Sequence, residues 1–181
     1  MQKHNNPDNL IVYHGTTHLI DSIDVEKWKP YKDFGRGFYV TQDFNHARNI
    51  AVRNKQLEKV QYGNDAASFV YSYDMDMKRA QSFSIKEFTE ADLDWMRFVL
   101  NNRRISGKSH NYDIIIGPTA NDDTSLVLKS YFSGLYGDIE SDRALAIALE
   151  MIEAENLPYQ IYFGTNIAID CLAQRGKAKK V

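Results

Sequence analysis

Residues 9–16 read NLIVYHGT and residues 33–41 read DFGRGFYVT. The β-branched and aromatic residues of Asn9–His14 predict a short strand that ends at a glycine turn. Phe38–Thr41 predicts a second short strand after two glycines. Tyr112–Gly117 (YDIIIG) predicts a third, strongly buried strand, which the following proline stops. Three short apolar strands, each followed by polar residues, therefore set the framework of the fold.

Helices and strands alternate irregularly along the rest of the chain. Asp43 is a predicted N-cap, and the apolar residues after it follow helical spacing. Ser68–Asp74 and Tyr159–Phe163 are further predicted strands. Helices are predicted after Thr89 and over Thr124–Phe132, Asp142–Glu155 and Thr165–Leu172. Because no regular βαβ rhythm appears, we expect the α+β class, with a largely antiparallel sheet core and flanking helices.

The composition is that of one ordinary domain. The chain has 181 residues, a net charge of −2 and a single cysteine, Cys171. This charge does not favour a general nucleic-acid or membrane binder, and one cysteine excludes an internal disulfide and a cysteine-based zinc cluster. We expect an N-terminal extension at 1–8, one domain at 9–174 and a flexible basic tail at 175–181. No signal peptide or membrane-spanning run is recognised, so we expect a cytoplasmic protein.

The sequence contains partial matches to a dinucleotide-binding glycine motif and to a pair of zinc ligands, but neither motif is complete. Gly35-Arg36-Gly37 resembles a nucleotide loop, but the third glycine position of the dinucleotide-binding pattern is Val40, and the segment continues into a strand. His14 and His18 have the spacing of zinc ligands on a helix. The GTTH segment is a poor helix and shows no third ligand, so we expect no metal.

Four segments taken in order resemble a known superfamily. They are YHGT at 13–16, GFYVT at 37–41, GPTANDD at 117–123 and the late strand YQIYF at 159–163. This order is similar to the ADP-ribosyltransferase-like superfamily and, within it, to the small bacterial DUF3990 family, over about Ile11–Leu172. The resemblance implies a split, largely antiparallel β-sheet around NAD, which serves as co-substrate.

The resemblance also implies roles for individual residues. His14 would hydrogen-bond a hydroxyl of the nicotinamide ribose, and the backbone of Gly15 would meet the nicotinamide carboxamide. Thr16 would hold the adenine-side ribose, and Tyr39 would stack on the nicotinamide ring. The third position of the superfamily's His-Tyr-Glu pattern falls on Gln160, which departs from that pattern.

Two further positions are candidates for NAD contacts. Arg36 could reach the pyrophosphate, although an exposed loop arginine is the ordinary explanation for it. Asp122 or Asp123 could supply the carboxylate that Gln160 lacks, although a helix N-cap and an acid in the first turn explain them equally simply.

The glutamine leaves more than one function open. Breaking the nicotinamide–ribose bond creates positive charge on the sugar, which a carboxylate stabilises; losing such a contact costs on the order of 3 kcal/mol. The leading hypothesis is a toxin-like mono-ADP-ribosyltransferase, acting on a protein or nucleic-acid acceptor and neutralised by an antitoxin or other neighbouring-gene partner. An NAD glycohydrolase and a non-catalytic NAD or ADP-ribose-binding module are alternatives. A tRNA 2′-phosphotransferase shares the fold, but the net charge of −2 argues against it.

Overall fold

The first of two β-sheets is built around a long central strand. The computed structural model describes residues 8–120, 122–139, 141–152 and 156–181. In this sheet β3 (Phe69–Asp76) pairs antiparallel with β1 (Asn9–Thr16) along one edge. Its other edge pairs antiparallel with β7 (Leu172–Gln174) and β8 (Lys179–Lys180).

The second sheet has the order β2-β6-β5-β4, with the following bounds: β2 (Phe38–Val40), β6 (Tyr159–Phe163), β5 (Ile114–Pro118) and β4 (Ile85–Glu87). The β2–β6 and β6–β5 pairs are antiparallel, whereas β4 and β5 are parallel, so this sheet is mixed. The two sheets meet at one point, where Tyr13 of β1 and Thr41 exchange two backbone hydrogen bonds of 2.7 and 2.9 Å. The junction of the two sheets therefore lies at Tyr13 and Thr41.

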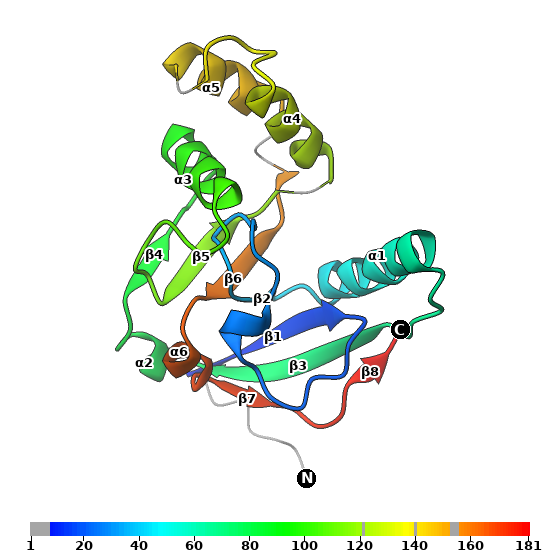
Figure 1. Cartoon of the computed structure of the whole chain (residues 1–181). Coiled ribbons are helices and arrows are strands. Elements are labelled where there is room, and N and C mark those ends of the chain that lie inside the picture. Colours follow the sequence, from blue (N-terminus) through cyan, green and yellow to red (C-terminus); the bar gives the residue numbers. More distant parts are fainter. Residues whose placement is uncertain (1–7, 121, 140, 153–155) are drawn as a thin grey trace.

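The helices divide between the two sheets (Figure 1). The long helix α1 (Phe44–Tyr62) packs beside β1 and β3, while α3 (Leu93–Arg104), α4 (Asp122–Phe132) and α5 (Asp142–Glu150) gather next to the second sheet. The shorter elements are the 3-10 turn η1 (Val25–Lys27), α2 (Met77–Ala80) and α6 (Asn166–Ile169). The α+β class is confirmed.

Two hydrophobic clusters lie on the two faces of the second sheet. One fills the space between the sheets and includes Val12, Phe38, Tyr73 and Phe163. The other lies under α3, α4 and α5, and includes Trp95, Leu128, Leu145 and Tyr162. Burial of each such large apolar side chain contributes about 1.5–3 kcal/mol. Because side chains alternate along a strand, neighbouring residues of β2 and β6 belong to different clusters.

Asp43 caps α1 as the sequence predicts, whereas the helix predicted after Thr89 begins at Leu93 with Asp92 as its cap, and α2, capped by Asp76, was not predicted. The carboxylates of Asp43, Asp92 and Asp76 accept hydrogen bonds from backbone N–H groups in the first turns of α1, α3 and α2. Among the described residues, no helix combines the length and the apolar character that crossing a membrane requires.

The structure differs from the expectation of a flexible tail at 175–181. Lys179 and Lys180 form β8 against Val70 and Phe69 of β3, and the N–H of Val181 donates to the carbonyl of Ser68 at 2.9 Å. The basic side chains made this segment look like a solvated end. Its backbone instead completes the free edge of the first sheet, where unpaired N–H and C=O groups favour a partner strand.

Candidate functional site

The imidazole of His14 is held at the junction of the two sheets. His14 lies on β1, and its Nδ1 is 2.7 Å from the carbonyl oxygen of Tyr39 on β2. A carbonyl oxygen only accepts hydrogen bonds, so Nδ1 carries the proton and donates. In the neutral ring, Nε2 is therefore a bare nitrogen that can only accept.

That second nitrogen is buried and has no hydrogen-bond partner among the described residues. The His14 ring lies 4.4 Å from the ring of Phe38 and 5.0 Å from that of Trp28, measured between centroids. Burial lowers the pKa of His14 from 6.5 to about 4, against the opposing effect of the Tyr39 carbonyl. At neutral pH the site therefore presents an uncharged acceptor enclosed by aromatic rings.

Gly15 and Thr16 have internal roles in this structure. A Cβ on Gly15 would lie 1.8 Å from the carbonyl oxygen of Ala47, so the close approach of α1 to β1 requires glycine here. The hydroxyl of Thr16 is buried and accepts a hydrogen bond of 3.1 Å from the N–H of His18. Thr16 thus stabilises the turn that follows β1.

The side chain of Tyr39 points away from His14. Phe38 packs in the cluster between the sheets, so the next residue along β2 faces the other cluster. The Tyr39 hydroxyl donates to the carbonyl of Gly35 at 2.7 Å and accepts from the N–H of Phe34 at 3.1 Å. Burial raises the pKa of this phenol well above its usual value. Tyr39 therefore ties the loop before β2 to the strand, and it meets His14 through its backbone.

Gln160 shares a face with Tyr39 rather than with His14. In the β2–β6 register Tyr39 lies opposite Tyr162, and Gln160 is two residues from Tyr162 on the same strand. Gln160 is half-buried and lies opposite Gly117 of β5. The side chains of Tyr39 and Gln160 therefore lie on one face of β2–β6. His14 contacts the backbone of β2 at Tyr39 and the ring of Phe38 on the opposite face.

Of the two remaining predicted NAD contacts, the structure describes the side chain of Arg36 but not that of Asp122. The guanidinium of Arg36 donates to the carbonyl of Ser106 at 3.0 and 3.2 Å and to that of Glu26 at 2.7 Å. These bonds join two loops and use the donors that a pyrophosphate would need. Asp122 begins α4, and its side chain and that of Asp123 lie outside the described residues.

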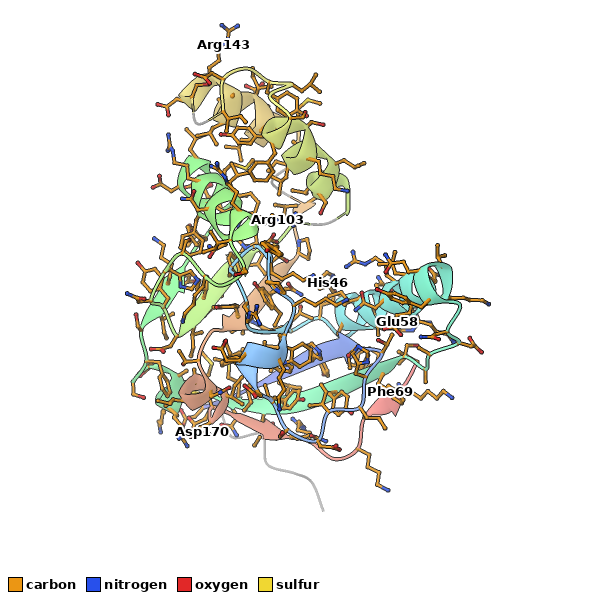
Figure 2. All side chains as sticks on the ribbon, viewed as in Figure 1. His46, Glu58, Phe69, Arg103, Arg143 and Asp170 are labelled. Carbon is orange, nitrogen blue, oxygen red and sulfur yellow. The ribbon has the colours of Figure 1, made fainter. Side chains whose placement is uncertain are left out.

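Trp28 and an ion pair at Asp33 were not predicted as site features. Asp33 is buried; its carboxylate accepts from the guanidinium of Arg103 at 2.6 Å and from the N–H of Ala120 at 2.7 Å. Figure 2 shows Arg103 at the end of α3, next to the segment that precedes β2. Residues 19–36 carry no periodic pattern. The signal that could have indicated Trp28 is its large apolar side chain, which stands in a polar stretch.

A separate hollow of about 280 Å³ lies between α3, α4 and α5. It is lined by Arg97, Leu100, Asn101, Arg104, Tyr131, Phe132 and Leu145. Arg97 is paired there with Asp142 at 2.5 Å and with Asp94 at 3.7 Å. Over the part of the chain that the structure describes, no group of three or more histidine, cysteine, aspartate and glutamate side chains could hold a metal ion.

Comparison with known proteins adds the family. Residues 10–174 match the family described as "Protein of unknown function (DUF3990)", which is most of the chain and agrees with the resemblance carried by YHGT, GFYVT and GPTANDD. No curated protein and no solved structure matched. The chain therefore belongs to the DUF3990 family.

Proposed function

We propose that this protein binds NAD at the junction of its two sheets and transfers the ADP-ribose part to a macromolecular acceptor. The observation that carries the proposal is the Nε2 atom of His14, a buried acceptor without a hydrogen-bond partner among the described residues. A bare imidazole nitrogen needs a hydroxyl or N–H donor. The resemblance to ADP-ribosyltransferases implies a ribose hydroxyl at this residue, and a hydroxyl satisfies that need.

In the proposed reaction one bond at ribose C1′ is exchanged for another. The bond from ribose C1′ to the nicotinamide nitrogen breaks, and both electrons go to that nitrogen, which neutralises the pyridinium ring. A lone pair of the acceptor forms the new bond to C1′, and the acceptor's proton leaves to solvent. A site that fixes the ribose and excludes water holds the reacting atoms in position for this displacement.

The aromatic rings beside His14 are suited to the charged nicotinamide. Trp28 and Phe38 touch the imidazole and each other, with 5.1 Å between their centroids. An aromatic face attracts a cationic ring by about 0.5–2 kcal/mol. In this proposal these two rings take the stacking role that the resemblance assigns to Tyr39, whose hydroxyl is engaged elsewhere.

Access to His14 requires the segment that carries Trp28 to move. The N–H of Ile20 donates to the hydroxyl of Tyr71 and the N–H of Val25 donates to Asn166, each at 2.8 Å, and the guanidinium of Arg36 donates to the carbonyl of Glu26 at 2.7 Å. Thr17 also donates to Glu58 on α1, which is labelled in Figure 2. Opening this segment would break these hydrogen bonds and expose Val25, which is buried in the cluster between the sheets.

A second candidate is a module that binds NAD or ADP-ribose without catalysis. The observation that favours it is Gln160, a neutral residue on the face of β2–β6 away from His14, at the position to which the resemblance assigns the superfamily glutamate. An amide keeps hydrogen bonding but offers no charge to the developing cation. The rate would then fall about a hundredfold or more.

One experiment separates the candidates. The protein is incubated with cell extract and NAD labelled in its ADP-ribose part, and released nicotinamide is measured alongside binding by calorimetry. Nicotinamide release with a labelled macromolecule supports transfer; release with free ADP-ribose indicates a glycohydrolase, and binding without release indicates the module.

The matched variants are His14→Ala and His18→Ala. His18 lies four residues further along, with a side chain that is 70% exposed, and serves as control. We expect His14→Ala to weaken NAD binding at least tenfold and His18→Ala to leave it unchanged. Equal affinity of wild type and His14→Ala, or no NAD binding by the wild type, overturns the proposed function.

A further inference from the structure

A second unpartnered polar atom lies close to His14. Among the described residues, the hydroxyl of Tyr73 is buried without a hydrogen-bond partner, as is Nε2 of His14. Tyr73 is 2% exposed. Burying a hydroxyl without a partner costs about 1–3 kcal/mol, so such an atom calls for an explanation.

The strand register brings the two side chains to one face. His14 of β1 lies opposite Tyr71 of β3, and Val12 lies opposite Tyr73. Alternation then places His14, Tyr71 and Tyr73 on the same face of the sheet, with His14 and Tyr73 as diagonal neighbours. Diagonal neighbours are within reach of long side chains.

Both side chains also touch the same ring of the second sheet. The centroid of Phe38 lies 4.4 Å from that of His14 and 5.7 Å from that of Tyr73. The two unpartnered atoms thus belong to one cluster between the sheets. The neighbouring Tyr71 differs, because its hydroxyl accepts the N–H of Ile20 at 2.8 Å.

The chemistry of the pair selects a kind of ligand group. His14 can only accept at Nε2, since its Nδ1 donates to the Tyr39 carbonyl. Burial raises the pKa of Tyr73 far above neutrality, so its hydroxyl stays protonated and can donate. A neutral hydroxyl fits both, because it donates to one group and accepts from the other. An ionised phosphate or carboxylate oxygen has no proton to donate to the bare nitrogen of His14, and this neutral imidazole offers it no positive charge.

We propose that Tyr73 is a second binding residue of the His14 site, and that the two side chains together hold one hydroxyl group of the ligand. The assignment rests on the proposed function, in which this group is a hydroxyl of the nicotinamide ribose. It adds a residue of β3 to a site otherwise formed by β1, β2 and the segment of Trp28.

The test compares Tyr73→Phe with Tyr71→Phe. Removing the Tyr73 hydroxyl should raise the dissociation constant for NAD about fivefold to tenfold, the effect of one neutral hydrogen bond. The midpoint of urea denaturation of the ligand-free protein should stay the same or rise, because an unpaired buried hydroxyl is removed. The Tyr71→Phe midpoint should fall, since that hydroxyl holds Ile20.

A double-mutant cycle with His14→Ala tests whether one hydroxyl is shared. Once His14 is removed, adding Tyr73→Phe should weaken NAD binding less than it does in the wild type. Fully additive effects would show two independent contacts and overturn the shared hydroxyl. Unchanged NAD affinity in Tyr73→Phe, as expected if only water occupies the space, overturns the assignment. A lowered midpoint of urea denaturation in Tyr73→Phe also overturns it, because it would reveal an internal partner of the hydroxyl.

The proposed function can fail separately from this assignment. If the wild-type protein binds no NAD, the same variants are titrated with ADP-ribose and with adenosine, which carry ribose hydroxyls without nicotinamide. Weaker binding of either ligand by Tyr73→Phe would support the hydroxyl site while NAD transfer is abandoned. Failure of the wild type to bind any of the three ligands overturns both proposals.

Discussion

The neutral state of His14 predicts a pH dependence of stability. Burial lowers its pKa to about 4 in the folded protein, against 6.5 for an ordinary histidine. Between these values the unfolded chain binds a proton that the folded protein does not. Folding stability therefore rises with pH in this interval, and the contribution of His14 is lost as pH falls from about 6.5 to about 4. At about 1.4 kcal/mol per pKa unit, the full loss is about 3 kcal/mol.

The assay is urea denaturation of the wild type and of His14→Gln at several pH values from 7.5 to 4. Glutamine does not titrate, and its amide can still donate to the Tyr39 carbonyl. His46 and His110 also have pKa values lowered by burial, but both remain in the two proteins and cancel in the difference. We expect the unfolding free energy of the wild type, minus that of the variant, to fall by about 3 kcal/mol as the pH is lowered from 7.5 to 4.

Two results would refute this reasoning. Parallel stability curves for wild type and His14→Gln would show that His14 has the same pKa in both states. A pKa near 6.5 for His14 in the folded protein, followed by NMR, would show that the ring is solvated. Either result would also show that the His14 imidazole is not the enclosed group on which the proposed NAD site depends.

Three further predictions concern access, charge and the loop before β2. Trp28→Ala should speed NAD association severalfold in stopped-flow measurements, because it uncovers the imidazole beside it; an unchanged rate would show that Trp28 is not a barrier. Because Gln160 lies on the face of β2–β6 away from His14, Gln160→Glu should leave the rate of nicotinamide release unchanged; an increase of about a hundredfold would show that this position faces the ribose cation. Arg103→Met leaves the buried carboxylate of Asp33 without its ion-pair partner, so the unfolding free energy from urea denaturation should drop by about 3–5 kcal/mol; a change below about 1 kcal/mol would contradict that role.

The strands of the core were accessible to sequence reasoning because their apolar runs are short and clearly bounded. The run at 159–163 became β6 with the same limits. The run at Asn9–His14 became β1, which continues through Gly15 to Thr16, and the run at Tyr112–Gly117 became β5, which begins at Ile114 and includes Pro118. The parallel strand β4 (Ile85–Glu87) was missed. Its side chains are mostly exposed, and it is held by backbone pairing to Ile114–Ile116, so it carries no hydrophobic pattern.

The direction of each candidate side chain was less accessible. A run such as FYV shows alternation, but it does not show which face meets the other sheet. The structure turns Phe38 toward His14 and Tyr39 toward the helices, as the separate clusters show. Trp28 reaches His14 from a segment without periodicity, so its contact depends on tertiary packing that no local pattern encodes.

The glycines around Arg36 show how packing can imitate a ligand motif. A Cβ on Gly37 would lie 2.2 Å from the ring of Tyr162, whose hydroxyl donates to the carbonyl of Arg36 at 2.8 Å. Gly35 has a φ of 89°, which favours glycine. Both glycines thus follow from the close fit of this loop, and neither requires a phosphate.

Within YHGT, internal packing accounts for every residue except His14. Tyr13 stacks edge-on against a ring of α1 at 5.4 Å and bridges the two sheets through its backbone. Gly15 is required by the approach of α1, and the hydroxyl of Thr16 stabilises the next turn. These three residues are accounted for by internal contacts, whereas His14 keeps a buried acceptor that the described protein groups leave unused. Core packing alone would have been served better by an apolar residue, so the cost of this nitrogen is the strongest reason to look for a ligand there.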